Sequence, residues 1–156
     1  MQFTHIQDGK ARQVDVSKKP NAVRRAVAEG NIVLRPQTIL AIKKGPVAKG
    51  NVLNTATAAA ALAVKQTPYI IPFCHQIAVT SIKVTYSVND TAIKAVVEVK
   101  SEGKTGVEME ALTGVSVALL TIWDMVKSME KDETGNYPVT ILSSIRVTEK
   151  HKDETQ

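Results

Sequence analysis

The chain has 156 residues, of which 44% are hydrophobic and 22% are charged. This composition excludes a disordered or collagen-like chain, and the length suits a single domain over residues 1–156. The longest apolar run, residues 58–64, is far shorter than the ~20 residues that cross a bilayer, and the N-terminus has no export signal, so we expect a cytoplasmic protein without a membrane span. The single cysteine, Cys74, excludes an internal disulfide.

The net charge of +5 is concentrated near the N-terminus, where residues 1–50 contain ten Lys and Arg against three Asp and Glu. Such a segment attracts polyanions, either nucleic acid or a phosphorylated metabolite, or it serves only solubility. Aromatic residues make up 4% of the chain, which is low for a protein that stacks nucleic-acid bases. A small phosphate ester therefore fits better than a nucleic acid.

Prolines, glycines and hydrophobic periodicity divide the first half of the chain into predicted elements. Pro20 with Asn21 is typical of a helix start and Gly30 of a helix end, while Pro36 opens a second helix. A third helix is nearly all alanine, so another element can approach it closely. In chain order we expect an extended segment to about residue 17, helices over residues 22–29, 38–44 and 51–66, and an extended or turning segment over residues 68–76, which holds two prolines.

The second half of the chain predicts two strands, a long helix and a closing strand, over residues 81–88, 93–100, 106–129 and 139–147. Apolar and polar residues alternate in the first two strands, and Asn89 with Asp90 forms the turn between them. Apolar residues recur every three or four positions in the long helix, and Thr105 with Glu108 matches a capping box at its start. This order predicts an α+β fold of the ferredoxin-like type, an antiparallel sheet with helices packed on one face.

One group of candidate reactive residues combines a carboxylate with cations. Asp124 and Lys127 are three positions apart on the long helix and must be neighbours on its surface, as an ordinary ion pair also requires. Asp124 lies between two apolar residues, Trp123 and Met125. Burial there would raise the pKa of its carboxyl, and pairing with a lysine would hold the group ready for proton transfer, so either suits an acid or base. Lys49 precedes a predicted helix start, which favours a phosphate, although a plain surface lysine also fits.

A second group combines a histidine, a thiol and two acids. His75 lies in a proline-stiffened segment that suits proton transfer or ligand contact, with a hydrogen-bonded structural histidine as the alternative. We assign Cys74 a contact role, since a nucleophilic thiol needs a neighbour that lowers its pKa. Glu108 and Glu110 lie in the first turn of the long helix, where the dipole favours acids irrespective of function. Glu110 fits this explanation less well because it enters an otherwise apolar helix.

The spacing along the long helix predicts how the chain assembles. Glu110 and Asp124 are fourteen residues apart, which is about 21 Å at ~1.5 Å per residue. A nucleotide-sized ligand scarcely reaches both within one chain. If both belong to one site, a second copy must supply one of them, so we expect a homo-oligomer with sites between subunits.

Five segments stand out as motifs: FTHI from Phe3, VDVSKKPNAVRRAVAEG from Val14, KGNVLNTA from Lys49, IPFCHQI from Ile71 and GKTGVEMEALTGVSVALLTIWDMVKSMEK from Gly103. Together and in this order they resemble the cyclic pyranopterin monophosphate synthase family of molybdenum cofactor biosynthesis. The resemblance implies a phosphorus-oxygen lyase that converts 3',8-cyclo-7,8-dihydroguanosine 5'-triphosphate to cyclic pyranopterin monophosphate and pyrophosphate, with no cofactor. It also implies a ferredoxin-like subunit in a hexamer, built as a trimer of dimers with active sites at the dimer interface.

Matching motif positions carries residue roles over to this chain. The resemblance places catalytic roles on Asp124, Lys127 and Lys49. It places substrate contacts on Phe73, Cys74, His75, Glu108, Met109, Glu110 and Arg24, the last of these near the phosphates. We name no required metal because no local acidic cluster argues for one, although magnesium can accompany a triphosphate.

The chain departs from the family pattern at several positions. Asn51 stands where aspartate is usual, Gln76 where proline is usual, and Ala22 where threonine is usual. The Gly-Gly-Lys-Ser-Gly tail of many bacterial members is absent from the C-terminal sequence RVTEKHKDETQ, so a phosphate contact from that tail is not carried over.

Two other classes of protein share some of these features. A small basic nucleic-acid-binding module also combines a ferredoxin-like sheet with excess cations, but this chain lacks the sheet aromatics of RNA readers. A noncatalytic oligomeric metabolite sensor would keep the pocket without the chemistry, and the presence of Asp124 and Lys127 argues against it.

Overall fold

The computed structural model describes residues 6, 7 and 9–154, so residues 3–5 of the FTHI motif and residues 155–156 of the C-terminal tail lie outside the described residues. In chain order the elements are β1 (Ile6–Gln7), β2 (Lys10–Ala11), β3 (Ala22–Val33), α1 (Pro36–Lys44), α2 (Val52–Ile70), β4 (Val79–Val88), β5 (Ala92–Gly103), α3 (Glu108–Glu130) and β6 (Ile141–Glu154).

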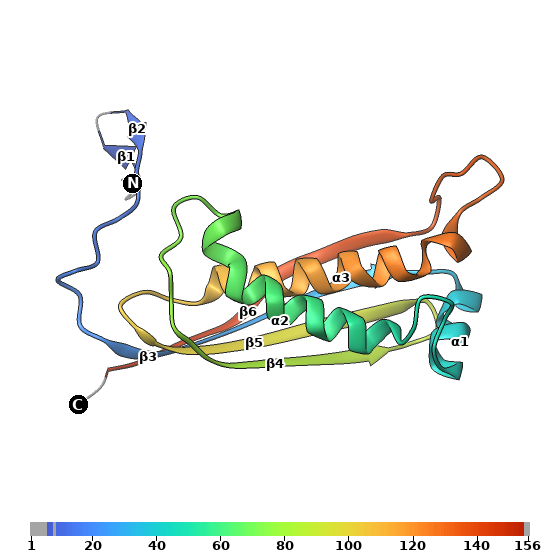
Figure 1. Ribbon diagram of the computed structural model, residues 1–156, viewed down its shortest axis with the longest axis horizontal. Helices are drawn as coiled ribbons and strands as arrows, with labels where there is room; N and C mark the ends of the chain where they lie inside the picture. The colour runs from blue at the N-terminus through green and yellow to red at the C-terminus, as the bar shows by residue number, and fades with distance from the viewer. Residues whose placement is uncertain (1–5, 8, 155–156) are drawn as a thin grey trace.

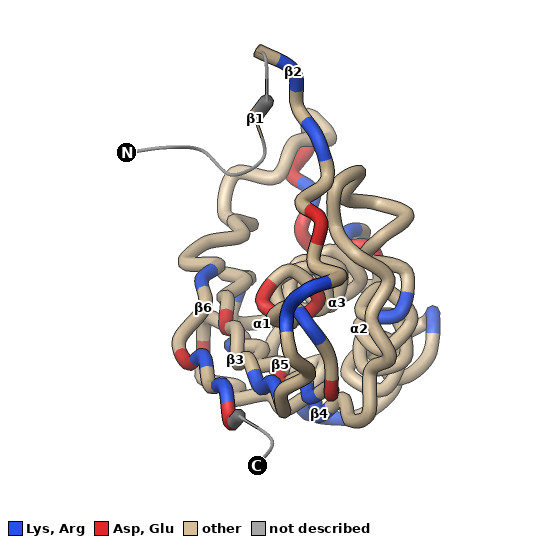
Figure 2. Tube along the Cα trace, turned by 90° about the vertical axis from the view of Figure 1, so that its left-hand side faces the viewer, with Lys and Arg blue, Asp and Glu red and all other residues tan. Residues whose placement is uncertain are grey.

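Within the described residues, a four-stranded antiparallel sheet with the order β4-β5-β3-β6 forms one layer of the molecule. The helices α2 and α3 lie side by side on one face of this sheet, and α1 lies at one end (Figure 1). The α+β ferredoxin-like prediction is confirmed. Strands β1 and β2 form a separate hairpin that stands away from this body in both overall views (Figures 1 and 2).

The predicted helix over residues 22–29 is wrong, because this segment forms the first part of β3, a central strand. Its alternate residues Ala26 and Ala28 are buried in the hydrophobic core, while β5 and β6 pair with its two edges. Gly30 does not end the element either. A Cβ at Gly30 would lie 2.9 Å from the Leu119 side chain of α3, so glycine is needed for close packing. Strand pairing on both sides therefore overrides the local helix signal.

The other predicted elements exist, with shifted ends. α2 continues to Ile70 and contains Pro68, so the predicted extended segment begins only at Ile71. Pro68 has no backbone N–H to donate within the helix, and α2 ends two residues later. Asn51 begins α2 by accepting a hydrogen bond from the backbone N–H of Asn54 at 2.9 Å, so the departure from aspartate leaves this cap intact.

The long helix α3 forms the centre of the hydrophobic core, packed against both the sheet and α2. It is the one helix in the described part of the chain with the length and apolar composition of a membrane span, yet 56% of that stretch is buried inside the protein, as in a core helix. The predicted capping box is wrong: the helix begins at Glu108 with Val107 as its N-cap residue, and no side chain caps it. The closing strand β6 runs to Glu154, well past its predicted end.

Candidate active site

Lys49, Asp124 and Lys127 meet in one cluster, hereafter the carboxylate-lysine cluster. Lys127 Nζ donates to Asp124 Oδ1 at 2.7 Å, and Lys49 Nζ donates to Asp124 Oδ2 at 2.8 Å. Lys49 also donates to the main-chain carbonyl of Asp124 at 2.8 Å. Both carboxylate oxygens are therefore occupied by a cation, one from the same helix and one from a distant loop.

A tight turn between α1 and α2 positions Lys49. Val47 and Gly50 exchange two backbone hydrogen bonds, of 3.0 and 2.8 Å, across this turn. Gly50 has a φ of 106°, a conformation that other residues rarely adopt. The turn thus depends on the glycine that follows Lys49, and it holds the lysine against the C-terminal half of α3.

The two lysines alter the pKa of Asp124. Hydrogen bonds from Lys127 and then Lys49 lower the pKa of the Asp124 carboxyl to about 2, and the same contact raises the pKa of Lys127. The Asp124 side chain is 56% exposed, so pairing rather than burial perturbs it. At neutral pH the cluster holds a carboxylate between two ammonium groups, with a net positive charge.

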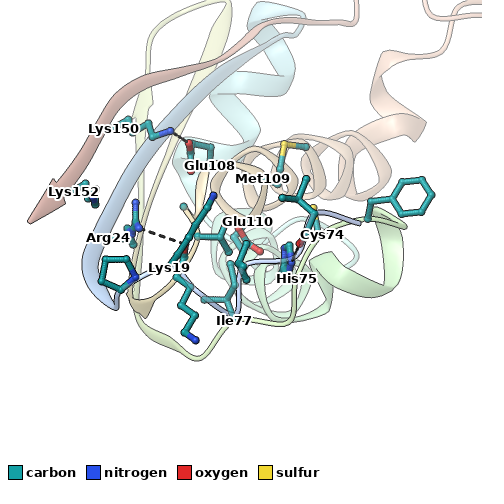
Figure 3. A pocket seen from close by; sticks show the side chains of 17 residues that line it. Lys19, Arg24, Cys74, His75, Ile77, Glu108, Met109, Glu110, Lys150 and Lys152 are labelled. Atoms are coloured by element: carbon teal, nitrogen blue, oxygen red, sulfur yellow. Dashed lines mark hydrogen bonds and ion pairs between the residues drawn. The ribbon is translucent and has the colours of Figure 1, made fainter. Parts of the chain in front are cut away.

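A pocket of about 590 Å³ lies at the other end of α3, hereafter the α3 N-terminal pocket. Figure 2 faces this end of the molecule, and Figure 3 shows the pocket from close by. All seven residues predicted to contact substrate line it: Arg24, Phe73, Cys74, His75, Glu108, Met109 and Glu110. Lys49, Asp124 and Lys127 are not among its lining residues.

The N-terminal segment is tied across the pocket by hydrogen bonds to two motifs. His75 Nε2 lies 2.6 Å from the Val14 carbonyl oxygen, and Lys104 Nζ donates to the Ser17 carbonyl at 2.6 Å. A carbonyl oxygen only accepts, so Nε2 of His75 carries the proton and Nδ1 is the nitrogen that can accept one. His75 therefore makes the hydrogen bond expected of a structural histidine while also lining the pocket.

Two acids and a thiol form the chemically distinctive part of this pocket. Glu110 is only 2% exposed, and its pKa is raised by burial and, secondarily, by the charge of Glu108. Burial and then the charge of Glu110 raise the pKa of Cys74. The thiol therefore stays protonated at neutral pH, which argues for contact rather than nucleophilic attack.

The pocket is also more cationic than its motifs predicted. Beside Arg24, whose guanidinium donates to the carbonyls of Gly103 and Lys104, further lysines line it: Lys19, Lys104, Lys150 and Lys152. Lys19 and Lys104 lie within the quoted motifs and could have been singled out from the sequence. Lys150 and Lys152 could not, because only the pairing of β6 with β3 brings the C-terminal segment beside Arg24.

Comparison with known proteins decides the family. The MoaC family profile matches residues 13–153. The chain belongs to the MoaC family. A relative from Methanoregula boonei, named "Probable cyclic pyranopterin monophosphate synthase", is 62% identical over 99% of both chains. A relative of the same name from Archaeoglobus fulgidus is 60% identical over 97% of both. A relative from Methanothermobacter thermautotrophicus, named "Probable cyclic pyranopterin monophosphate synthase accessory protein", is 55% identical over 98% of this chain and 96% of its own.

This MoaC-family chain thus has two chemically distinct groups of charged side chains at opposite ends of α3. Asp124 and Lys127 lie near its C-terminal end, and Glu108 and Glu110 lie in its first turn. No group of three or more His, Cys, Asp or Glu side chains within residues 6–7 and 9–154 is arranged to hold a metal ion. Each group combines acids with cations, which suits a polyanionic ligand that must also exchange protons.

Proposed function

We propose that this chain is a cyclic pyranopterin monophosphate synthase, acting in molybdenum cofactor biosynthesis. Its substrate would be 3',8-cyclo-7,8-dihydroguanosine 5'-triphosphate, and its products cyclic pyranopterin monophosphate and pyrophosphate. The observation that carries the proposal is the carboxylate-lysine cluster, in which two lysines from separate elements hold one carboxylate. Membership of the MoaC family and the names of its relatives support it.

The cations would bind the triphosphate and stabilise the leaving group. Lys49, Lys127 and Arg24 would balance the charge of the substrate and the negative charge that develops on departing pyrophosphate. In the closing step a sugar hydroxyl oxygen attacks the α-phosphorus, the bond from that phosphorus to the bridging oxygen breaks, and pyrophosphate leaves. The hydroxyl proton must pass to a base as this bond forms.

Asp124 is the base that we propose for proton transfer during ring opening, pterin formation and phosphate closure. With a pKa of about 2 it is fully ionised but only weakly basic in the free protein. Phosphate oxygens that draw Lys49 and Lys127 away from the carboxylate would let its pKa rise. Substrate binding would thus make Asp124 a stronger base at the moment when it is needed.

We also propose that the complete site forms between two copies of the chain in a hexamer built as a trimer of dimers. The separation of Asp124 from Glu110 along α3 favours a site to which each copy contributes one half. Large apolar side chains are exposed on α2, on α3 and at the pocket, as expected of a surface that a second copy would cover. They are Leu62, Tyr69, Ile70, Phe73, Met109 and Leu120.

Binding of nucleic acid is not proposed, because the open face of the sheet offers no stacking platform. Ion pairs between Arg25 and Glu98 and between Lys94 and Glu29 occupy that face. Tyr86, the one aromatic residue of the four sheet strands as described, lies on the helix side, where its hydroxyl is 3.4 Å from Thr57 Oγ1. We further propose a single domain over residues 1–156 and a cytoplasmic location.

The test is to incubate the purified protein with the cyclised nucleotide and to measure pyrophosphate and an oxidisable, then fluorescent, pterin. Both products should form in equal amounts. Tight binding of the nucleotide without either product would indicate a noncatalytic binding protein and would contradict the proposal.

A further inference from the structure

The side chain of Glu108 adopts a specific conformation at the edge of the α3 N-terminal pocket. A Cβ atom added to Gly106 would lie 1.9 Å from Glu108 Oε2 and 2.7 Å from its Cδ. The carboxylate therefore occupies the space where any other residue at position 106 would place its side chain. Glu108 is folded back toward the preceding loop instead of capping its own helix.

Lys150 of β6 holds the carboxylate in this conformation. Its Nζ forms an ion pair with Glu108 Oε1, which Figure 3 shows at the side of the pocket opposite Cys74 and His75. In the sheet register Lys150 pairs with Ala26 of β3, so it lies on the helix-facing side of β6. The Glu108 side chain is 25% exposed and that of Lys150 is 59% exposed, so the acid is the more enclosed partner of the pair.

The position of Glu108 matters because a second carboxyl lies in the same pocket. Glu110 is buried, and the charge of Glu108 acts on it unfavourably. Figure 3 shows the two side chains pointing in different directions, Glu108 toward Lys150 and Glu110 toward the Cys74 side. A cation bound to Glu108 keeps the two acids apart and weakens the repulsion between them.

We propose that Lys150 is a positioning residue for the synthase reaction, which acts by holding the Glu108 carboxylate over Gly106 and away from Glu110. This inference rests on the proposed function. Lys150 itself need not touch the substrate, because its effect passes through the orientation of Glu108. The two pocket acids are then presented to the ligand from separate, defined directions.

The experiment measures kcat and KM for pyrophosphate release in Lys150→Met, which keeps the aliphatic stem and removes the charge. We expect kcat to fall roughly 10- to 100-fold, as for a misplaced active-site group, and KM to stay within about twofold. Lys150→Arg retains the ion pair and should recover most of the activity. Lys100→Met is the matched control, because Lys100 pairs with Glu98 on the opposite face of the sheet.

A double-mutant cycle separates positioning from other roles. If Lys150 acts through Glu108, adding Lys150→Met to Glu108→Gln lowers kcat no further. The inference would be overturned if Lys150→Met lowered kcat as much in the Glu108→Gln background as in wild type. It would also be overturned if Lys150→Met alone raised KM with kcat unchanged, or lowered the melting temperature with both kinetic constants unchanged. A wild-type protein that forms no pyrophosphate would instead refute the proposed function, and this inference with it.

Discussion

Lys49 Nζ and the Asp124 carboxylate are 2.8 Å apart although 75 positions separate the two residues in the sequence. The same ammonium group also binds the main-chain carbonyl of Asp124, so it is anchored at two points of α3. The turn that ends at Gly50 and the long helix are therefore fixed relative to each other at this point. A ligand that binds Lys49 acts directly on the charge of Asp124.

Asp124→Asn and Lys127→Ala should each lower turnover at least about 100-fold, because one removes the base and the other a phosphate-binding cation. The fold should persist, since both side chains are about half exposed. Pyrophosphate release and circular dichroism measure the two effects. Asp90→Asn, which removes the carboxylate of the exposed Lys43–Asp90 pair, is the control and should remain active. Undiminished activity in either site variant would remove that residue from the mechanism.

The ion pairs of Asp124 should stabilise the protein only above a certain pH. Its pKa in the folded protein, about 2, is lower than its ordinary value of 3.8, so the stabilisation is present above about pH 4 and disappears as pH falls toward 2. Chemical unfolding of wild type and Asp124→Asn at several pH values would measure this. The difference between them should shrink between about pH 5 and pH 2. A difference that grows with acidity would contradict the assigned pairing.

Mixed oligomers should restore activity from two inactive variants. In a dimer that combines Asp124→Asn with Glu110→Gln, one composite site carries both changes and the other carries neither. Random mixing of subunits should then recover about a quarter of wild-type activity, as two-fold symmetry requires. The measurement is turnover after co-expression with different affinity tags. Activity that stays at the level of the separate variants would show that each site lies within one chain.

Glu110→Gln should raise the melting temperature at neutral pH by a few degrees while it lowers turnover. Burial raises the pKa of Glu110 in the folded protein, so its ionisation opposes folding. Stability from this group is highest below the ordinary pKa of 4.5 and is lost as pH rises through the folded pKa. Glu108→Gln, which loses an ion pair, is the control and should not gain stability. A lower melting temperature for Glu110→Gln would indicate a structural hydrogen-bonding role.

Gly114→Ala should destabilise the protein by about 1–3 kcal/mol through overpacking between α2 and α3. A Cβ there would lie 2.8 Å from a Val64 methyl group and 3.1 Å from Val97. Gly103→Ala is the matched control, because nothing lies within 4 Å of its added Cβ. Urea unfolding compares the two variants. Equal stabilities would mean that α2 moves aside at little free-energy cost.

Local patterns were sufficient for much of this fold. The period-two strands, the alanine-rich helix and the long apolar helix were predictable because each buries one face whose spacing follows from backbone geometry. The strand over residues 22–29 was not predictable from its local pattern. Its helix-like ends, Asn21 and Gly30, concealed a strand whose identity depends on pairing with both β5 and β6.

The motifs were enough to name the reactive groups: Asp124, Lys127, Lys49 and seven of the residues that line the α3 N-terminal pocket. The partners of these groups came from the folded chain alone, since contacts between distant segments depend on how the layers pack. Lys49 reaches Asp124 through the turn before α2, and Lys150 reaches Glu108 because β6 runs beside β3. The low pKa of Asp124 follows from such contacts, because the neighbouring cations that lower it are not all encoded in local spacing.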